Sequence, residues 1–239
     1  MNKLEKFIGI KCNFWCWLFG SLKSFHLSHK DVIEVEEKFL GTNICPLLEW
    51  GEQESLNDCF RRELNKSDRL EIAVGFCSYR SLKELEKLVL QGNIRNVCVI
   101  LGMYYFDGLL SSLYELVLEI NERWSKLGIG EIRLVHSCKY HGKLYCFYRK
   151  NRIVSAIIGS PNLSFLVERQ VYPSQHEIAL LTNNLRTLKK FAKYLEYLKS
   201  RRISENIEIL EKYKSHVEKD PDLGGEQRQS KIIYKIFSP

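Results

Sequence analysis

Four polar residues in this sequence are spaced in a way that suits chemistry on a phosphodiester. His141 and Lys143 stand where one apolar segment begins, and Ser160 and Asn162 follow the end of the next apolar segment. Residues two apart on an extended chain share a face, so each pair projects to one side. An imidazole can attack phosphorus, while an ammonium, a hydroxyl and an amide hold the non-bridging oxygens as negative charge builds.

The two apolar segments are expected to form a hairpin. Residues 143–148 and 153–159 are joined by the polar turn Arg149–Arg152, which is typical of two antiparallel strands. Pairing about this turn would bring the four polar residues to the same end of the hairpin. A His and a Lys two residues apart are common on solvated strands. The same pair followed by GSxN after a hairpin-length gap is a far more restrictive pattern.

The rest of the chain alternates strand-like and helix-like segments. Near-continuous apolar runs predict buried strands, and apolar residues at helical spacing predict helices. This order predicts an α/β fold with a mixed sheet and helices on both faces. The expected strands are 70–76, 97–101, 131–135 and 177–181, and the expected helices are 54–64, 81–90, 109–127, 185–200 and 204–216.

The phrases HGKLY (141–145) and IGSPNLS (158–164) resemble the signature of the phospholipase-D-like (HKD) superfamily. They are most similar to NgoFVII-type restriction endonucleases, and the resemblance extends over residues 31–200. Tyr148 occupies the position where many lipid-cleaving members carry an Asp after the HxK. This departure argues against a phospholipase and is usual in the nuclease branch.

The resemblance implies a covalent mechanism without a metal ion or other cofactor. His141 would form a phosphohistidine, and Lys143, Asn162 and Ser160 would bind the phosphate. The family's acidic residue that orients the histidine is matched by Glu177, with Glu168 as the fallback. The chain contains a single HxK, so a mechanism with two histidines requires a homodimer with one shared active site.

The resemblance favours a restriction-type endonuclease that cuts double-stranded DNA. The alternatives are a nonspecific nuclease, a phospholipid-cleaving relative, or a DNA-binding module with a degenerate active site. Similar enzymes commonly carry a separate C-terminal DNA-recognition domain, which this chain is too short to hold. Specificity would then depend on loops of the catalytic domain or on a separate specificity subunit, or the gene is truncated.

Three regions are expected: an N-terminal extension (1–30), the nuclease domain (31–217) and a C-terminal tail (218–239). The tail contains the turn-like DPDLGG and at most one strand, in 231–237. The aromatic stretch Phe7–Phe19 is interrupted by Lys11 and Asn13 and is too short to span a bilayer. It is interpreted as a docking extension or a start codon placed too far upstream, then as a peripheral membrane contact, and last as an export signal.

Composition agrees with a nucleic-acid partner without requiring one. The formal net charge is +7, and the eight cysteines form no CxxC pair, which favours a reducing, cytoplasmic location. Cys98 and Cys146 lie in apolar runs and are expected to be buried. The basic segment 189–202 is either a solvated helix face or a phosphate-contacting surface.

Several other polar residues are possible site residues. His136 and His176 fit no ligand pattern and are expected to be structural or exposed. Tyr104, Tyr105 and Arg169 could touch DNA, with core packing an equal alternative for the tyrosines. The site offers mainly Glu177 as a carboxylate, so the sequence predicts no magnesium site.

Overall fold

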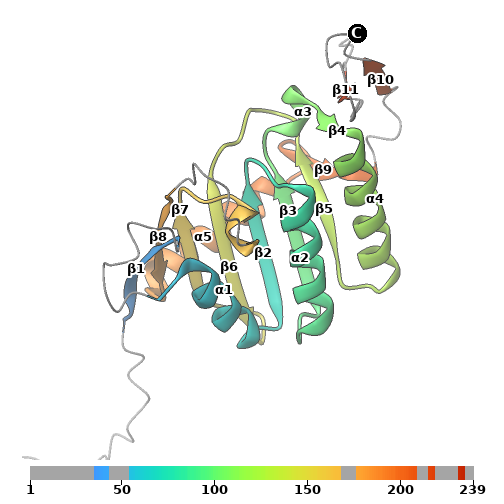
Figure 1. Cartoon of the computed structure of the whole chain (residues 1–239). Coiled ribbons are helices and arrows are strands. Elements are labelled where there is room, and N and C mark those ends of the chain that lie inside the picture. Colours follow the sequence, from blue (N-terminus) through green and yellow to red (C-terminus); the bar gives the residue numbers. More distant parts are fainter. Residues whose placement is uncertain (1–34, 43–53, 168–175, 209–214, 219–230, 235–239) are drawn as a thin grey trace, which may run out of the picture. The chain divides into compact units, whose positions relative to one another are not determined.

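The computed structural model describes residues 35–42, 54–167 and 176–208, together with the backbone of 215–218 and 231–234. The expected extension at 1–30 lies outside the described residues. Figure 1 shows the elements in chain order. They are β1 (Glu37–Gly41), α1 (Leu56–Asn65), β2 (Arg69–Val74), α2 (Tyr79–Gln91), β3 (Asn96–Leu101), α3 (Tyr104–Asp107), β4 (Leu109–Leu110), α4 (Ser111–Lys126), β5 (Gly130–Val135), β6 (Lys143–Arg149), β7 (Arg152–Gly159), the 3-10 helix η2 (Leu163–Leu166), β8 (Ile178–Thr182), α5 (Leu185–Leu198), β9 (Ser204–Asn206), β10 (Ser215–Glu218) and β11 (Lys231–Tyr234).

The main sheet is mixed, as the sequence predicted. Its eight strands lie in the order β1-β8-β7-β6-β2-β3-β5-β9, and only the pairs β2–β3 and β3–β5 are parallel. This order places the carboxyl ends of β2, β3 and β5 at the same edge as the start of β6, the end of β7 and the start of β8. Ligands of open α/β sheets bind outside the carboxyl ends of the parallel strands. The two halves of the HxK and GSxN pattern both lie at this edge.

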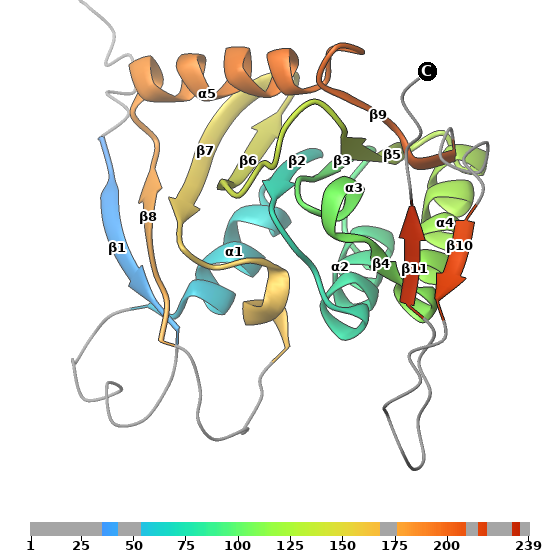
Figure 2. The same ribbon diagram turned by 90° about the horizontal axis from the view of Figure 1, so that it is seen from above.

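Helices cover both faces of the sheet, which confirms the predicted fold class. One apolar core lies between the sheet and α1, α2 and α4, with Phe60, Leu85 and Trp124 fully buried. A second, smaller core lies under α5, where Leu188 and Leu195 pack against β6 and its neighbours. Figure 2 shows α5 on one side of the sheet and the other three helices on the opposite side.

The hairpin turn is built by two residues in the left-handed region. Lys150 has φ 49° and Asn151 has φ 61°. Two central residues with positive φ make the tight turn whose twist matches that of paired strands, and asparagine tolerates this conformation. The register that follows pairs Leu144 with Ile158. The predicted turn at 149–152 therefore sets which ends of β6 and β7 meet.

Two predicted helices differ from the structure. Residues 204–216 were expected to be helical, but Ser204–Asn206 form β9 and Ser215–Glu218 form β10. β9 pairs with the edge of β5, and Arg133 donates to the Ser204 carbonyl at 2.7 Å, so tertiary pairing overrides the local preference. The helix expected from residue 109 begins at 111, because Leu109 and Leu110 pair with β11.

A buried carboxylate ties the sheet to α5. Glu71 of β2 is 1% exposed and accepts hydrogen bonds from Lys199 at 2.6 Å, from the Tyr148 hydroxyl at 2.7 Å and from Arg69. Burial by itself would raise the pKa of Glu71, but these hydrogen bonds outweigh it and hold the pKa below its ordinary value. Tyr148, which stands where lipid-cleaving relatives carry an Asp, is thus committed to the fold.

The remaining composition-based expectations concern cysteines and membranes. Cys98 and Cys146 are buried, as predicted, and burial raises the pKa of Cys98 to about 12. The cysteines in the described part of the chain are all free thiols. Within the same part, no helix has the length and apolar character needed to cross a bilayer.

Candidate active site

His141 and Lys143 form a contact pair at the start of β6. Lys143 is the first residue of the strand, opposite Val74 of β2, and only 7% of it is exposed. Its ammonium nitrogen lies 2.7 Å from the His141 carbonyl oxygen, 2.9 Å from Nδ1 and 3.2 Å from Nε2 of the same residue. An ammonium only donates, so a ring nitrogen of His141 that bonds Lys143 accepts through its lone pair, and the tautomer decides which of the two nitrogens this is. The exposed imidazole is thereby held at the strand edge.

Asn162 reaches the same place from the other strand of the hairpin. Its Oδ1 accepts a hydrogen bond of 3.1 Å from the backbone N–H of Phe76, just after β2. The Phe76 ring packs edge-on against the His141 ring, with 5.8 Å between centroids. Asn162 and His141 thus both contact Phe76, which is expected if β6 and β7 bring them to the same edge of the sheet. The hydrogen bond also fixes the amide orientation, which leaves the Asn162 NH2 group without a partner among the described residues.

Ser160 is engaged by the neighbouring strand. Its hydroxyl accepts from the Ile178 N–H at 3.2 Å and donates to the Ile178 carbonyl at 3.4 Å, while its own N–H bonds that carbonyl at 3.0 Å. In this geometry Ser160 joins the end of β7 to the start of β8. Phosphate binding by its hydroxyl would require these bonds to rearrange.

Glu177 lies immediately before β8, half-buried beside Lys143. Its backbone is held by Thr42, which accepts from the Glu177 N–H at 3.0 Å and donates its own N–H to the Glu177 carbonyl at 3.0 Å. Burial raises the pKa of Glu177 and lowers that of Lys143, while the two opposite charges partly offset both shifts. In the described chain Glu177 makes no hydrogen bond to His141. Its electrostatic partner there is Lys143.

Two glycines at this edge allow close approach. A Cβ on Gly75 would lie 3.0 Å from His141 Cδ2, so a side chain there would press on the imidazole. A Cβ on Gly159 would lie 2.3 Å from the Ile178 carbonyl oxygen, where β7 and β8 meet. Gly75 and Phe76 are site residues that the sequence reasoning missed. A strand ending in Gly-Phe carries no chemical signal, and the contact spans more than sixty residues of chain.

The segment that carries Asn162 is held in place by β6 and by the apolar core. The Tyr145 hydroxyl, fully buried in β6, donates to the Pro161 carbonyl at 2.7 Å. The next residues, Leu163–Leu166, form η2 and pack into the core with Phe60. The GSPN segment is therefore anchored at both ends.

A family model describes the chain over residues 54–212: the NgoFVII restriction endonuclease N-terminal PLD domain. The chain belongs to this family. The matched range contains the HxK and GSxN residues and all of the sheet except β1. No curated protein sequence matches the chain.

Solved structures of phospholipase-D-like proteins resemble this PLD domain in fold. NucT from Helicobacter pylori is 14% identical, with a TM-score of 0.46 over 69% of this chain and 95% of its own. Nuc from Salmonella typhimurium, a phospholipase D family member, is 13% identical, with a TM-score of 0.45 over 72% of this chain and 96% of its own. Phosphatidylserine synthase from Haemophilus influenzae Rd KW20 is 16% identical, with a TM-score of 0.48 over 72% of this chain and 39% of its own.

Tyr104, another polar residue named from the sequence, lies beside the site of this PLD domain, because its ring packs edge-on against that of Phe76 with 5.5 Å between centroids. Tyr104 is buried, and its hydroxyl bonds the Cys77 backbone. Of the two alternatives for this tyrosine, DNA contact and core packing, the structure therefore shows core packing. His136 is partly buried, bonds the Arg201 carbonyl at 3.1 Å and lies against the Tyr105 ring, with 5.8 Å between centroids. Glu168 and Arg169 fall outside the described residues. Within the described part, no group of three or more His, Cys, Asp or Glu could hold a metal ion.

The basic segment of α5 divides into two groups. Lys199 is committed to the fold through Glu71 and Glu196, at 2.6 Å each. Lys189, Lys190 and Lys193 are exposed. They fit a solvated helix face and a phosphate-contacting surface equally well.

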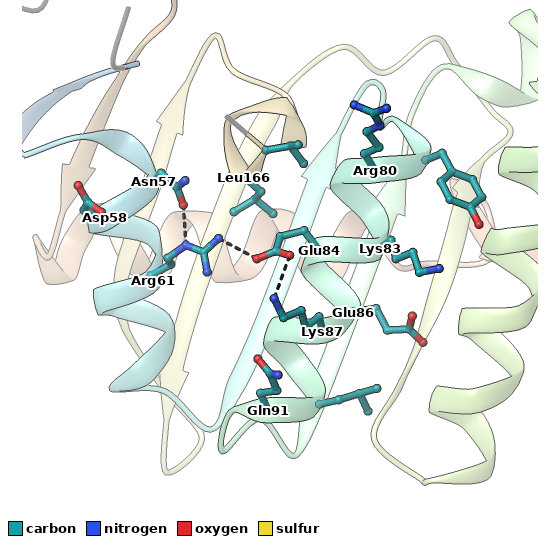
Figure 3. Close-up of a pocket in the computed structure, with 13 residues that line it drawn as sticks. Asn57, Asp58, Arg61, Arg80, Lys83, Glu84, Glu86, Lys87, Gln91 and Leu166 are labelled. Atoms are coloured by element: carbon teal, nitrogen blue, oxygen red, sulfur yellow. Dashed lines mark hydrogen bonds and ion pairs between the residues drawn. The ribbon is translucent and has the colours of Figure 1, made fainter. Parts of the chain in front are cut away.

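A groove lies between α1 and α2, and part of its charge is paired within it (Figure 3). It encloses about 990 Å³ and has Leu166 of η2 on its wall. Within it Arg61 bonds Asn57 at 2.8 Å and Glu84 at 2.9 Å, and Lys87 lies 3.7 Å from Glu84. Glu84 thus pairs with Arg61 and Lys87, whereas Arg80 and Lys83 of the lining form no ion pair with the described residues.

Proposed function

We propose that this PLD domain is a DNA phosphodiesterase that works without a metal ion, through a covalent phosphohistidine at His141. The observation that carries the proposal is the meeting of His141, Lys143 and Asn162 around Phe76. An imidazole, an ammonium and a carboxamide NH2 group lie at one edge of the sheet. These are the groups needed to attack phosphorus and to stabilise the negative charge that develops on its oxygens.

The proposed reaction has two steps. In the first, a His141 ring nitrogen bonds to phosphorus while the bond to the leaving oxygen breaks, and His141 of the partner subunit gives that oxygen a proton. In the second, the same partner histidine takes a proton from water, whose oxygen bonds to phosphorus and breaks the P–N bond. Lys143 and Asn162 hold the non-bridging oxygens throughout. Glu177 would orient a histidine in the dimer, and in the single chain its charge supports Lys143.

Double-stranded DNA is the proposed substrate because the family is described as a restriction endonuclease domain. Tyr148 supports this choice over a phospholipid, since the residue in the usual Asp position is buried and bonded to Glu71. A separate subunit or loops of this domain would supply sequence specificity. The presence of His141, Lys143, Ser160 and Asn162 argues against a degenerate, binding-only module.

The test is cleavage of supercoiled plasmid in excess EDTA by the wild-type protein and by His141→Ala. Wild type should nick or cut the DNA, and His141→Ala should bind it without cutting. His136→Ala is the matched control and should cut normally, because the His136 imidazole contacts the Arg201 carbonyl and the Tyr105 ring and not the four candidate site residues. Brief reaction with labelled DNA should leave labelled DNA joined to the protein through an acid-labile, base-stable P–N bond.

Three results would contradict the proposal: cleavage that EDTA abolishes, cleavage that survives His141→Ala, or hydrolysis of phosphatidylcholine vesicles in preference to DNA. If the wild-type protein cuts DNA in EDTA as proposed, sequencing the ends of the fragments separates a specific endonuclease from a nonspecific nuclease.

A further inference from the structure

The exposed face of α5 carries several cations that form no ion pair with any described residue. They are Arg186, Lys189, Lys190 and Lys193, and all four are exposed. Leu188 and Leu195 of the same helix are buried against the sheet. Because an α-helix repeats every 3.6 residues, the four cations share the side that points away from the sheet. We refer to these four residues as the α5 basic stripe.

The α5 basic stripe lowers the stability of the helix that carries it. Arg186 and Lys190 are four residues apart, as are Lys189 and Lys193, and like charges at this spacing repel. Arg186 also lies in the first turn of α5, where the helix dipole disfavours a positive charge. A negatively charged ligand along the stripe would remove this repulsion.

Exposed cations of α4 are treated differently. Arg123 and Lys126 of α4 each form an ion pair with a glutamate four residues earlier. The single acidic residue of α5 is Glu196, which lies beyond the stripe and is paired with Lys199 at 2.6 Å. Exposure alone fits a solvated face as well as a binding surface. The repulsion within the stripe, and its contrast with α4, favour a binding surface for a polyanion.

The stripe also lies beside the catalytic edge of the sheet. Tyr194 of α5 is hydrogen-bonded through its hydroxyl to that of Tyr140, the residue before His141. Just beyond α5, the Arg201 carbonyl bonds His136 at 3.1 Å, after the end of β5. Figure 2 shows α5 lying across the sheet, from β8 to β9. DNA with a phosphate at His141 can therefore continue along the exposed side of α5.

We infer that the α5 basic stripe binds the backbone of the DNA that flanks the cleaved phosphate. The inference rests on the proposed function, which supplies DNA as the substrate. Lysine and arginine bind phosphates without regard to base sequence, so the stripe would position the duplex and leave specificity to other groups. With a rise of about 1.5 Å per residue, Arg186 to Lys193 spans about 10 Å, or about three base pairs of duplex.

The experiment measures binding of a labelled duplex oligonucleotide over a range of NaCl concentrations, in EDTA. It compares Lys190→Gln/Lys193→Gln with the control Lys83→Gln/Lys87→Gln, each introduced into the His141→Ala protein so that binding is measured without cleavage. Lys83 and Lys87 are exposed lysines of α2, on the opposite side of the sheet from α5. Both double variants change the net charge by the same amount.

Loss of two phosphate contacts should reduce the slope of log K against log[NaCl] by about 1.8, at about 0.9 per contact. Extrapolated from about 1 M salt, this change corresponds to binding about 30-fold weaker at about 0.15 M. The α2 control and Lys190→Arg/Lys193→Arg, which keeps the charge, should retain the slope of the His141→Ala parent. Thermal melts should show Lys190→Gln/Lys193→Gln to be at least as stable as that parent, because like charges have been removed.

Unchanged slope and affinity in Lys190→Gln/Lys193→Gln, or an equal loss in the α2 control, would overturn the inference and leave the proposed chemistry intact. Tighter binding to phosphatidylglycerol vesicles than to the duplex would also overturn it, because the stripe would then serve a membrane surface. If the double variant does not fold, Lys189→Gln gives the same comparison with an expected change of about 0.9. Weakened binding in the stripe variant, together with a wild-type protein that never cuts DNA, would support the stripe and refute the proposed function.

Discussion

Replacing Glu71 by alanine should destabilise the protein strongly, because this carboxylate is buried between the sheet and the end of α5. Glu71 is 1% exposed and accepts from Lys199, Tyr148 and Arg69. Removing the carboxylate leaves two cations in a site built around an anion. Breaking a buried pair on one side costs about 3–5 kcal/mol, because the remaining charge is uncompensated. For a chain of this size each kcal/mol shifts Tm by about 2–4 °C, so Tm should fall by roughly 6–20 °C.

Glu196→Ala is the matched control because Glu196 contacts the same ammonium at the same distance of 2.6 Å. Its side chain is 64% exposed, so its loss should cost about 0.5 kcal/mol or less. The measurement is urea unfolding of wild type and both variants, followed by circular dichroism. An equal loss in the free energy of unfolding for the two variants would show that contact with Lys199 alone, without burial, explains the contribution of Glu71.

The pH dependence offers a second check on Glu71. Its pKa in the folded protein is held below the ordinary value, so its contribution is fully present above about pH 4.3, the value for an unfolded glutamate. The contribution is lost as pH falls through the lower, folded-state pKa. The stability gap between wild type and Glu71→Ala should therefore narrow in acid. A gap that widens as pH falls would mean that the carboxyl is protonated at neutral pH.

Three further outcomes are expected from the catalytic edge. In Glu177→Gln, the decline of plasmid cleavage at alkaline pH should move to lower pH. Burial lowers the pKa of Lys143, and the carboxylate of Glu177 opposes that shift until it is removed. A decline at the same pH as in wild type would show that Glu177 does not support the charge of Lys143. Gly75→Ala should lower kcat by about 10-fold or more with little change in Tm, since the new methyl would press on His141 at 3.0 Å; unchanged kinetics would show that the imidazole can give way. Tyr145→Phe should cost about 1–2 kcal/mol in urea unfolding by leaving the Pro161 carbonyl unpaired, with a smaller loss of kcat than Gly75→Ala causes; a neutral effect on stability would mean that water replaces the hydroxyl.

The sequence by itself determined the local geometry of the hairpin and which candidate residues lie at its end. Two-residue spacing fixes which side chains share a face of a strand, and an asparagine in a short polar turn fixes where the strand reverses. These two local rules placed His141, Lys143 and Asn162 at one end of β6 and β7 without knowledge of the rest of the fold. The buried parallel strands could also be predicted from the sequence, because strands covered on both faces are apolar along their length.

Only the tertiary structure decided which distant groups complete the site. Phe76 and Gly75 contact His141 because β2 pairs with β6, a pairing that no local pattern specifies. The hydroxyl of Ser160 bonds β8 for the same reason. The stretch from Ser204 became a strand because β5 offered it an edge, although its own periodicity favours a helix. Local periodicity reports the burial of a segment, whereas strand partners and loop contacts depend on how all segments pack together, so they follow from the whole chain at once.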